Sequence, residues 1–111
     1  MFALLVRFSV RVGHEDAFDA LVAETLAAIA AEEPDTIVYV SHTAADEASV
    51  RVFYECYQSH DAFQAHEAAP QTRRFLSERT QYLVHPPEVW TLAPVAGAIN
   101  GRPLRGDGAP R

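Results

Sequence analysis

The chain has 111 residues, which is enough for one domain with a hydrophobic core and too few for two. Hydrophobic residues make up 49% and charged residues 22%, a composition that excludes a wholly disordered protein. Lys and Arg number 9 against 15 Asp and Glu, for a net charge of -6 without any basic run, so we expect no nucleic-acid partner.

No apolar stretch approaches the roughly 20 residues that a membrane-spanning helix needs, so no membrane partner is expected either. The apolar start of the chain is interrupted by Arg7 and Arg11 and lacks a small-residue cleavage site, unlike a secretory signal. The single Cys56 excludes an internal disulfide and a multi-cysteine zinc site. These features predict a cytoplasmic protein.

Residues 2–11 alternate between apolar and mixed side chains, which predicts a strand with one apolar face. Gly13 ends this strand, and two acidic residues then open a helix that Pro34 stops near Glu33. One face of this helix is marked by residues that recur every three or four positions, namely Phe18, Leu21, Val22, Thr25, Leu26 and Ile29.

Two strands rich in β-branched and aromatic residues follow over 36–43 and 49–57, close enough to pair as an antiparallel hairpin. Ser59 is the expected N-cap of a second helix, which is interrupted near Pro70 and runs on to Pro86-Pro87. Residues 89–92 form a short last strand.

The tail over 93–111 holds four of the five glycines and three of the seven prolines, and it has no apolar periodicity. We therefore expect a domain over 1–92 and a Gly/Pro-rich C-terminal tail over 93–111 that packs on the partner subunit.

The order β-α-β-β-α-β predicts an α+β, ferredoxin-like fold, with a four-stranded antiparallel sheet and two helices on one face. Both faces of the second and third strands carry apolar side chains. Two helices can cover only one face of the sheet, so the other face needs a different cover. Packing of one sheet against the sheet of a second copy meets this need, so a two-fold homodimer is expected.

Three motifs resemble those of the antibiotic biosynthesis monooxygenase family, and the resemblance extends over roughly residues 2–92. The motifs are Val12-Gly13-x-Glu15-x-x-Phe18, then Glu33-Pro34-Asp35 followed by Tyr39, and Phe53-x-Glu55-x-Tyr57 followed by Ala62 and His66. The resemblance implies a dimeric α+β barrel. Family members include cofactor-independent oxygenases that form polyketide quinones, haem-degrading enzymes and small-molecule isomerases.

Haem degradation is disfavoured here by two departures from the family pattern. Haem-degrading members use a histidine similar to His66 as the axial iron ligand, together with an asparagine in the first strand, and this chain has none there. The family often has tryptophan where this chain has Tyr57. No histidine pair has the i, i+4 spacing of a helical metal site, so we expect neither a cofactor nor a metal.

His66 is the strongest catalytic candidate, because an imidazole can accept or donate a proton near neutral pH. Tyr57 is the second, as a hydrogen-bond donor to a phenolic substrate. The alternatives are that His66 only hydrogen-bonds the strand after Tyr57, and that Tyr57 only packs in the core.

We expect the substrate contacts to come from Tyr39, Phe53, Glu55 and Phe75. Tyr39 and Phe53 would form an aromatic wall for a flat apolar ligand, and Glu55 would orient His66 or an incoming cation. Alternatively, the aromatic residues are simply core, and Glu55 forms a salt bridge with Arg7 or Arg51.

Two function hypotheses follow. In the first, the protein is a cofactor-independent monooxygenase, or an isomerase, acting on a small aromatic or quinone-like substrate between helices and sheet. In the second, it is a non-catalytic dimeric protein that binds a small molecule or assists another enzyme.

Overall fold

The structure is a computed structural model that describes residues 1–104. Its strands are β1 (Phe2–Ser9), β2 (Thr36–Ala44), β3 (Glu47–Tyr57), β4 (Glu88–Leu92), β5 (Ala98–Ile99) and β6 (Arg102–Pro103). Its helices are α1 (Glu15–Glu32), α2 (His60–Ala68), α3 (Pro70–Glu78) and the 3-10 helix η1 (Arg79–Tyr82). Among the described residues, no helix is both long and apolar enough to cross a membrane.

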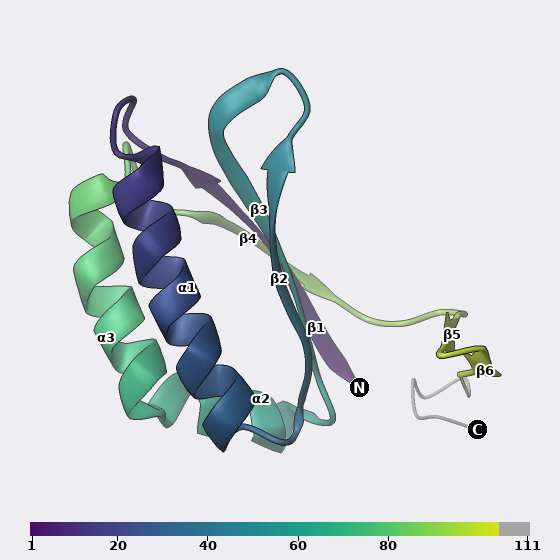
Figure 1. Ribbon diagram of the computed structural model, residues 1–111. Helices are drawn as coiled ribbons and strands as arrows, with labels where there is room; N and C mark the ends of the chain where they lie inside the picture. The colour runs from purple at the N-terminus through teal and green to yellow at the C-terminus, as the bar shows by residue number, and fades with distance from the viewer. Residues whose placement is uncertain (105–111) are drawn as a thin grey trace.

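The four long strands form one antiparallel sheet in the order β2-β3-β1-β4. Helices α1 and α3 lie side by side against one face of this sheet, and α2 crosses one end of it (Figure 1). This is the predicted ferredoxin-like α+β fold, which is therefore confirmed. The homodimer and the boundary between domain and tail stay predictions.

The core lies between the sheet and the helices because apolar side chains alternate along β1 as expected. Val6 is paired with Phe53 and Leu4 with Glu55, so these side chains share the helix-covered face. Phe53 and Phe18 are fully buried there. The predicted α1 stripe also faces this core, where Phe18, Leu21, Val22, Thr25 and Ile29 are buried.

The other face of the sheet, which we call the open face, is not covered by any described helix (Figure 1). Leu5 is paired with Tyr54 on one side and with Trp90 on the other, which places the three side chains on this face. Trp90 is 46% exposed and Val40 is 42% exposed. The open face therefore presents large apolar groups to solvent.

The second helix differs from its prediction near its end. Ser59 caps α2 by accepting a hydrogen bond from the amide of Ala62, and Pro70 starts α3, as expected. The expected extension to Pro86-Pro87 is wrong, because helical structure ends at Tyr82. The backbone beyond it pairs with the end of the first strand, where Val84 N–H donates to Ser9.

The tail contains structure that the sequence did not predict. Strands β5 and β6 form a hairpin around Asn100-Gly101, whose φ angles are 53° and 75°. Positive φ at both turn positions is typical of a two-residue hairpin turn. The hairpin lies beyond the end of β4, away from the helices (Figure 1). The rest of the predicted tail, residues 105–111, lies outside the described part of the chain.

Candidate functional site

The predicted site residues come from four elements on the helix-covered side of the sheet. They are Tyr39 on β2, Phe53, Glu55 and Tyr57 on β3, His66 on α2, and Phe75 on α3. The ring centroids of His66 and Tyr57 are 5.0 Å apart, and those of His66 and Tyr39 are 5.4 Å apart. The fold therefore brings Tyr39 and Tyr57 of the sheet together with His66 of α2.

A cavity of about 210 Å³, which we call the inner cavity, lies between the sheet and helices α2 and α3. Four of the predicted residues line it, namely Tyr39, Glu55, His66 and Phe75. Phe53 and Tyr57 do not, and both are fully buried behind its wall. The cavity is smaller than the 300–1,000 Å³ that is usual for ligand pockets, so it fits only a small ligand.

Glu55 is buried and accepts a hydrogen bond of 2.5 Å from the Tyr57 hydroxyl. Burial raises the pKa of Glu55, although the hydrogen bond from Tyr57 and the nearby His66 oppose this shift. Burial and the Glu55 carboxylate raise the pKa of Tyr57 far above its ordinary value. The Tyr57 hydroxyl therefore keeps its proton and directs it to Glu55.

Neither of the two salt bridges considered for Glu55 forms. Arg7 points to the open face, where it pairs with Glu47 at 3.1 Å and with Glu88 at 3.5 Å. Arg51 forms a bidentate salt bridge with Asp19, in which Nε donates to Oδ1 at 2.9 Å and Nη2 donates to Oδ2 at 3.0 Å. Glu55 is thus free of these cations and remains part of the site.

Tyr39 lies across the cavity from α3, and its ring meets Phe53 edge-on at 5.7 Å. Burial raises the pKa of Tyr39 far above its ordinary value, and the Glu55 carboxylate adds to the effect. Its hydroxyl is therefore a neutral hydrogen-bond donor at the cavity wall.

His66 is 4% exposed, and its Nδ1 lies 2.7 Å from Oε1 of Glu33. The hydroxyl of Thr72 is 3.3 Å from the same nitrogen. The contact that the sequence suggested, with the strand after Tyr57, is replaced by this contact with Glu33.

The second ring nitrogen of His66 has a different environment. Within residues 1–104, every buried side-chain nitrogen and oxygen has a hydrogen-bond partner. Nε2 of His66 makes no hydrogen bond to another described residue, so it retains accessible surface. One ring nitrogen is therefore held by a carboxylate, and the other has no partner among the described residues.

Arg79 is a site residue that the sequence did not reveal. It lines the inner cavity, and its guanidinium lies over the rings of Phe8 and Phe75 at 5.3 and 5.4 Å. Burial lowers its pKa, while Tyr39, Glu67 and Glu55 oppose that shift. Its position at the C-cap of α3, four residues after Phe75, is the signal that could have identified it.

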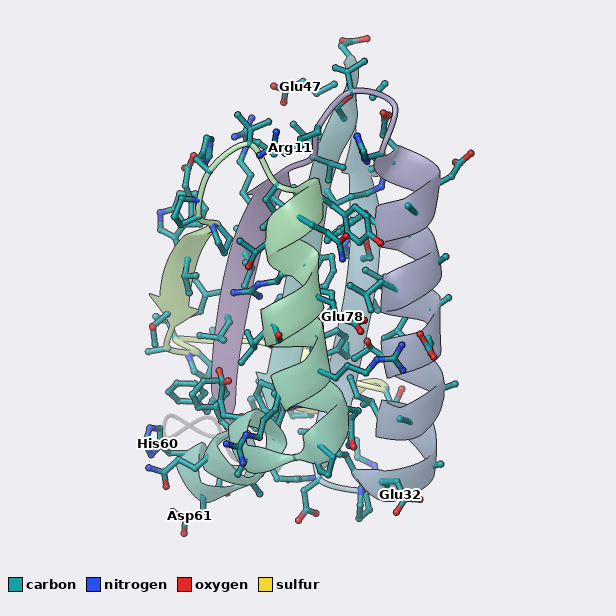
Figure 2. The ribbon with its side chains drawn as sticks, turned by 90° about the vertical axis from the view of Figure 1, so that its left-hand side faces the viewer. Arg11, Glu32, Glu47, His60, Asp61 and Glu78 are labelled. Carbon is teal, nitrogen blue, oxygen red and sulfur yellow. The ribbon has the colours of Figure 1, made fainter. Side chains whose placement is uncertain are left out.

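A second hollow, which we call the outer groove, has a volume of about 410 Å³. His66, Glu33, Pro34, Ala65 and Pro70 are among the residues that line it. Glu32, which also lines it, lies at the same end of the molecule as His60 and Asp61 of α2 (Figure 2). His66 therefore borders both the inner cavity and the outer groove.

Residues 1–78 match the antibiotic biosynthesis monooxygenase family, a span that includes every site residue except Arg79. The chain belongs to this family. Solved structures share the fold of this chain. The protein Rv0793 from Mycobacterium tuberculosis is 26% identical with a TM-score of 0.81, over 88% of this chain and 98% of that one.

A candidate antibiotic biosynthesis monooxygenase from Caulobacter crescentus also has a fold similar to that of the present chain. It is 20% identical with a TM-score of 0.78, over 82% of this chain and 86% of that one. No curated protein matches the sequence. The family is therefore established, whereas the reaction has to be argued from the site.

The other groups that could react or bind a metal have less favourable surroundings than His66. Cys56 is buried on the open face, where burial raises the pKa of its thiol, and its Sγ lies 3.8 Å from Sδ of Met1. Across residues 1–104, no cluster of three or more His, Cys, Asp and Glu side chains could hold a metal ion. The chemistry of this family member is therefore best sought around His66.

Proposed function

We propose that this family member is a cofactor-independent monooxygenase that oxidises a small phenolic or quinone-like aromatic substrate in the inner cavity. The observation that carries the proposal is that His66, whose Nε2 has no partner among the described residues, lines a cavity that Arg79 and Tyr39 also line. This combines a proton acceptor, a cation and a neutral hydroxyl donor within largely apolar walls.

The reaction needs no reductant other than the substrate. His66 accepts the phenolic proton, and the resulting anion is stabilised by the Arg79 guanidinium. An electron-rich ring carbon then bonds to dioxygen to form a peroxide. The peroxide takes the proton back from His66, and loss of the hydrogen on the same ring carbon with cleavage of the O–O bond then releases water and leaves a quinone. One oxygen atom thus enters the product and the other leaves as water.

Tyr39 and Glu55 orient the substrate and balance the charge of Arg79 in this scheme. The predicted direct role of Tyr57 has less support, because its hydroxyl is bonded to Glu55 and does not line the cavity. We propose that Tyr57 acts through Glu55, by holding that carboxyl in place, and that Phe53 supports the ring of Tyr39.

The open face supports the proposed two-fold homodimer. Large apolar side chains gather there, and burying them against a second copy would remove them from water. We further propose that residues 1–92 form the domain and that the tail over 93–111 packs on the partner. A single free thiol agrees with a cytoplasmic location.

Oxygen uptake with a panel of dihydroxynaphthalenes tests the proposed reaction. We expect the wild type to consume oxygen and to form quinone, and His66→Ala to lose most of this rate. His60→Ala, at the exposed start of the same helix, is the matched control and should keep it. Equal rates for wild type and His66→Ala would overturn the role of His66.

A non-catalytic binding or accessory role is the alternative, favoured by the small inner cavity and by the missing family tryptophan at Tyr57. An isomerase of the same family is a further possibility. A binder would take up ligand without consuming oxygen, and an isomerase would yield a product of unchanged formula. Product mass and oxygen uptake together distinguish the three.

A further inference from the structure

Glu33 lies where α1 ends, and its side chain is 9% exposed. Its Oε1 accepts hydrogen bonds from the Thr36 hydroxyl at 2.9 Å and from His66 Nδ1 at 2.7 Å. Its Oε2 accepts a third from the Gln71 amide, also at 2.7 Å. The carboxylate of Glu33 is thus held in one orientation by groups from three different elements.

The backbone of Glu33 is fixed as well. Its N–H donates to the carbonyl of Ile29, which closes the last turn of the helix, and Pro34 prevents the helix from continuing. Side chain and backbone are therefore both constrained, so the position of the carboxylate is set before any ligand binds.

The contact with Glu33 decides which nitrogen of His66 carries the proton. A carboxylate can only accept hydrogen bonds, so Nδ1 must be the donor in this contact. A neutral imidazole carries one proton, which leaves Nε2 unprotonated and able to accept another. Nε2 is also the nitrogen that keeps accessible surface.

We propose that Glu33 is a positioning residue that holds the proton of His66 on Nδ1 and thereby presents Nε2 as the proton acceptor. This inference rests on the proposed function only for its consequence in catalysis. When Nε2 takes a proton from the substrate, the ring becomes an imidazolium whose Nδ1–H still faces the Glu33 carboxylate. The pairing stabilises the charged ring, and the same proton is available on Nε2 to form the water that leaves.

Nitrogen-15 spectra of histidine-labelled full-length protein test the proton position without a substrate. His66→Asn identifies the His66 signals among those of the five histidines. We expect the wild type at neutral pH to show a protonated Nδ1 and an unprotonated Nε2. Glu33→Gln, which keeps the size of the side chain, should weaken this preference, because an amide oxygen is a poorer acceptor than a carboxylate and the amide NH2 can instead donate to Nδ1.

Glu32→Gln is the matched control, because Glu32 lines the same groove, is exposed and makes no contact with His66 within residues 1–104. It should leave the spectrum unchanged. A protonated Nε2 in the wild type, or an unchanged spectrum in Glu33→Gln, would overturn the proposal.

Oxygen uptake by the same variants tests the consequence. We expect Glu33→Gln to lower kcat by about tenfold or more with little change in KM, as part of the 10²–10⁴ that general-base catalysis supplies. An unchanged kcat would overturn the positioning role. If the wild type consumes no oxygen, the proposed function fails, whereas the spectra still decide the role of Glu33.

Discussion

The Tyr57 hydroxyl and the Glu55 carboxyl form a buried hydrogen bond of 2.5 Å beside the inner cavity. The two residues lie two positions apart on β3, so both point to the helix-covered face. Tyr57 is fully buried and Glu55 is 6% exposed, so both partners are largely removed from bulk solvent. The ionisation of Glu55, which lines the cavity, therefore affects the free energy of unfolding.

Glu55→Gln should change how the free energy of unfolding depends on pH. Because burial raises the pKa of Glu55, the folded protein binds this proton more tightly than the unfolded chain does. Glu55 therefore costs stability as pH rises above the usual carboxyl pKa of about 4.3. The cost is ~1.4 kcal/mol for each tenfold difference in proton affinity between the folded and unfolded states.

Urea unfolding at several pH values between 4 and 7 checks this expectation. The wild type should lose stability relative to Glu55→Gln as pH rises through this range. The exposed Glu32→Gln makes the same chemical change and should follow the wild type. A wild type that becomes more stable relative to Glu55→Gln with rising pH would contradict the raised pKa.

Tyr57→Phe should destabilise the protein by about 1–3 kcal/mol at neutral pH, because a buried carboxylate then lacks its donor. The ring itself stays in place, so no large cavity forms. A double-mutant cycle with Glu55→Gln isolates the coupling, which we expect at roughly 0.5–3 kcal/mol. Additive effects of the two changes would show that the hydrogen bond contributes nothing.

Arg79→Met should weaken the binding of an anionic hydroxynaphthoquinone while leaving the neutral naphthoquinone almost unaffected. The change keeps much of the length of the side chain and removes its charge. Loss of one charged contact should raise Kd by about tenfold, or ~1.4 kcal/mol. Isothermal titration measures both ligands.

Arg74→Met is the control for this experiment. Arg74 lies on the preceding helix α3 but points to solvent, where it pairs with Glu24 at 2.8 Å and with Glu78 at 3.2 Å. It should leave both affinities unchanged. An equal loss for the anionic and the neutral ligand would mean that Arg79 provides only packing.

Trp90→Asp should convert the proposed dimer to monomer, because it places a charge on the open face. Light scattering at micromolar concentration measures the mass. Val12→Asp is the control, since Val12 is 87% exposed but lies in the loop after β1 rather than on that face. A monomeric wild type would refute the dimer itself.

The fold could be predicted because apolar residues recur at regular spacing within each helix and strand, so each element can be identified from a short stretch of sequence. Alternation along β1 and the stripe from Phe18 to Ile29 identify the faces that meet in the core. The end of the second helix could not be predicted this way. It depends on pairing between Val84 and Ser9, which are far apart in the sequence.

The candidate site could be predicted only in part for the same reason. His66 and Glu55 stand out as ionisable residues within a family motif, and the structure brings both to one cavity. Glu33 stands out in the sequence only as part of the Glu33-Pro34-Asp35 motif, which assigns it no role. Its contact with His66 spans 33 positions and depends on how α1 and α2 meet.

In the proposed reaction, the substrate itself reduces dioxygen beside His66. Incubation of chelator-treated protein with a dihydroxynaphthalene under ¹⁸O₂, followed by mass spectrometry of the quinone, tests it most directly. We expect one labelled oxygen atom per product molecule with the wild type and almost none with His66→Ala. Unlabelled product, or a substrate that binds without being oxidised, would contradict it.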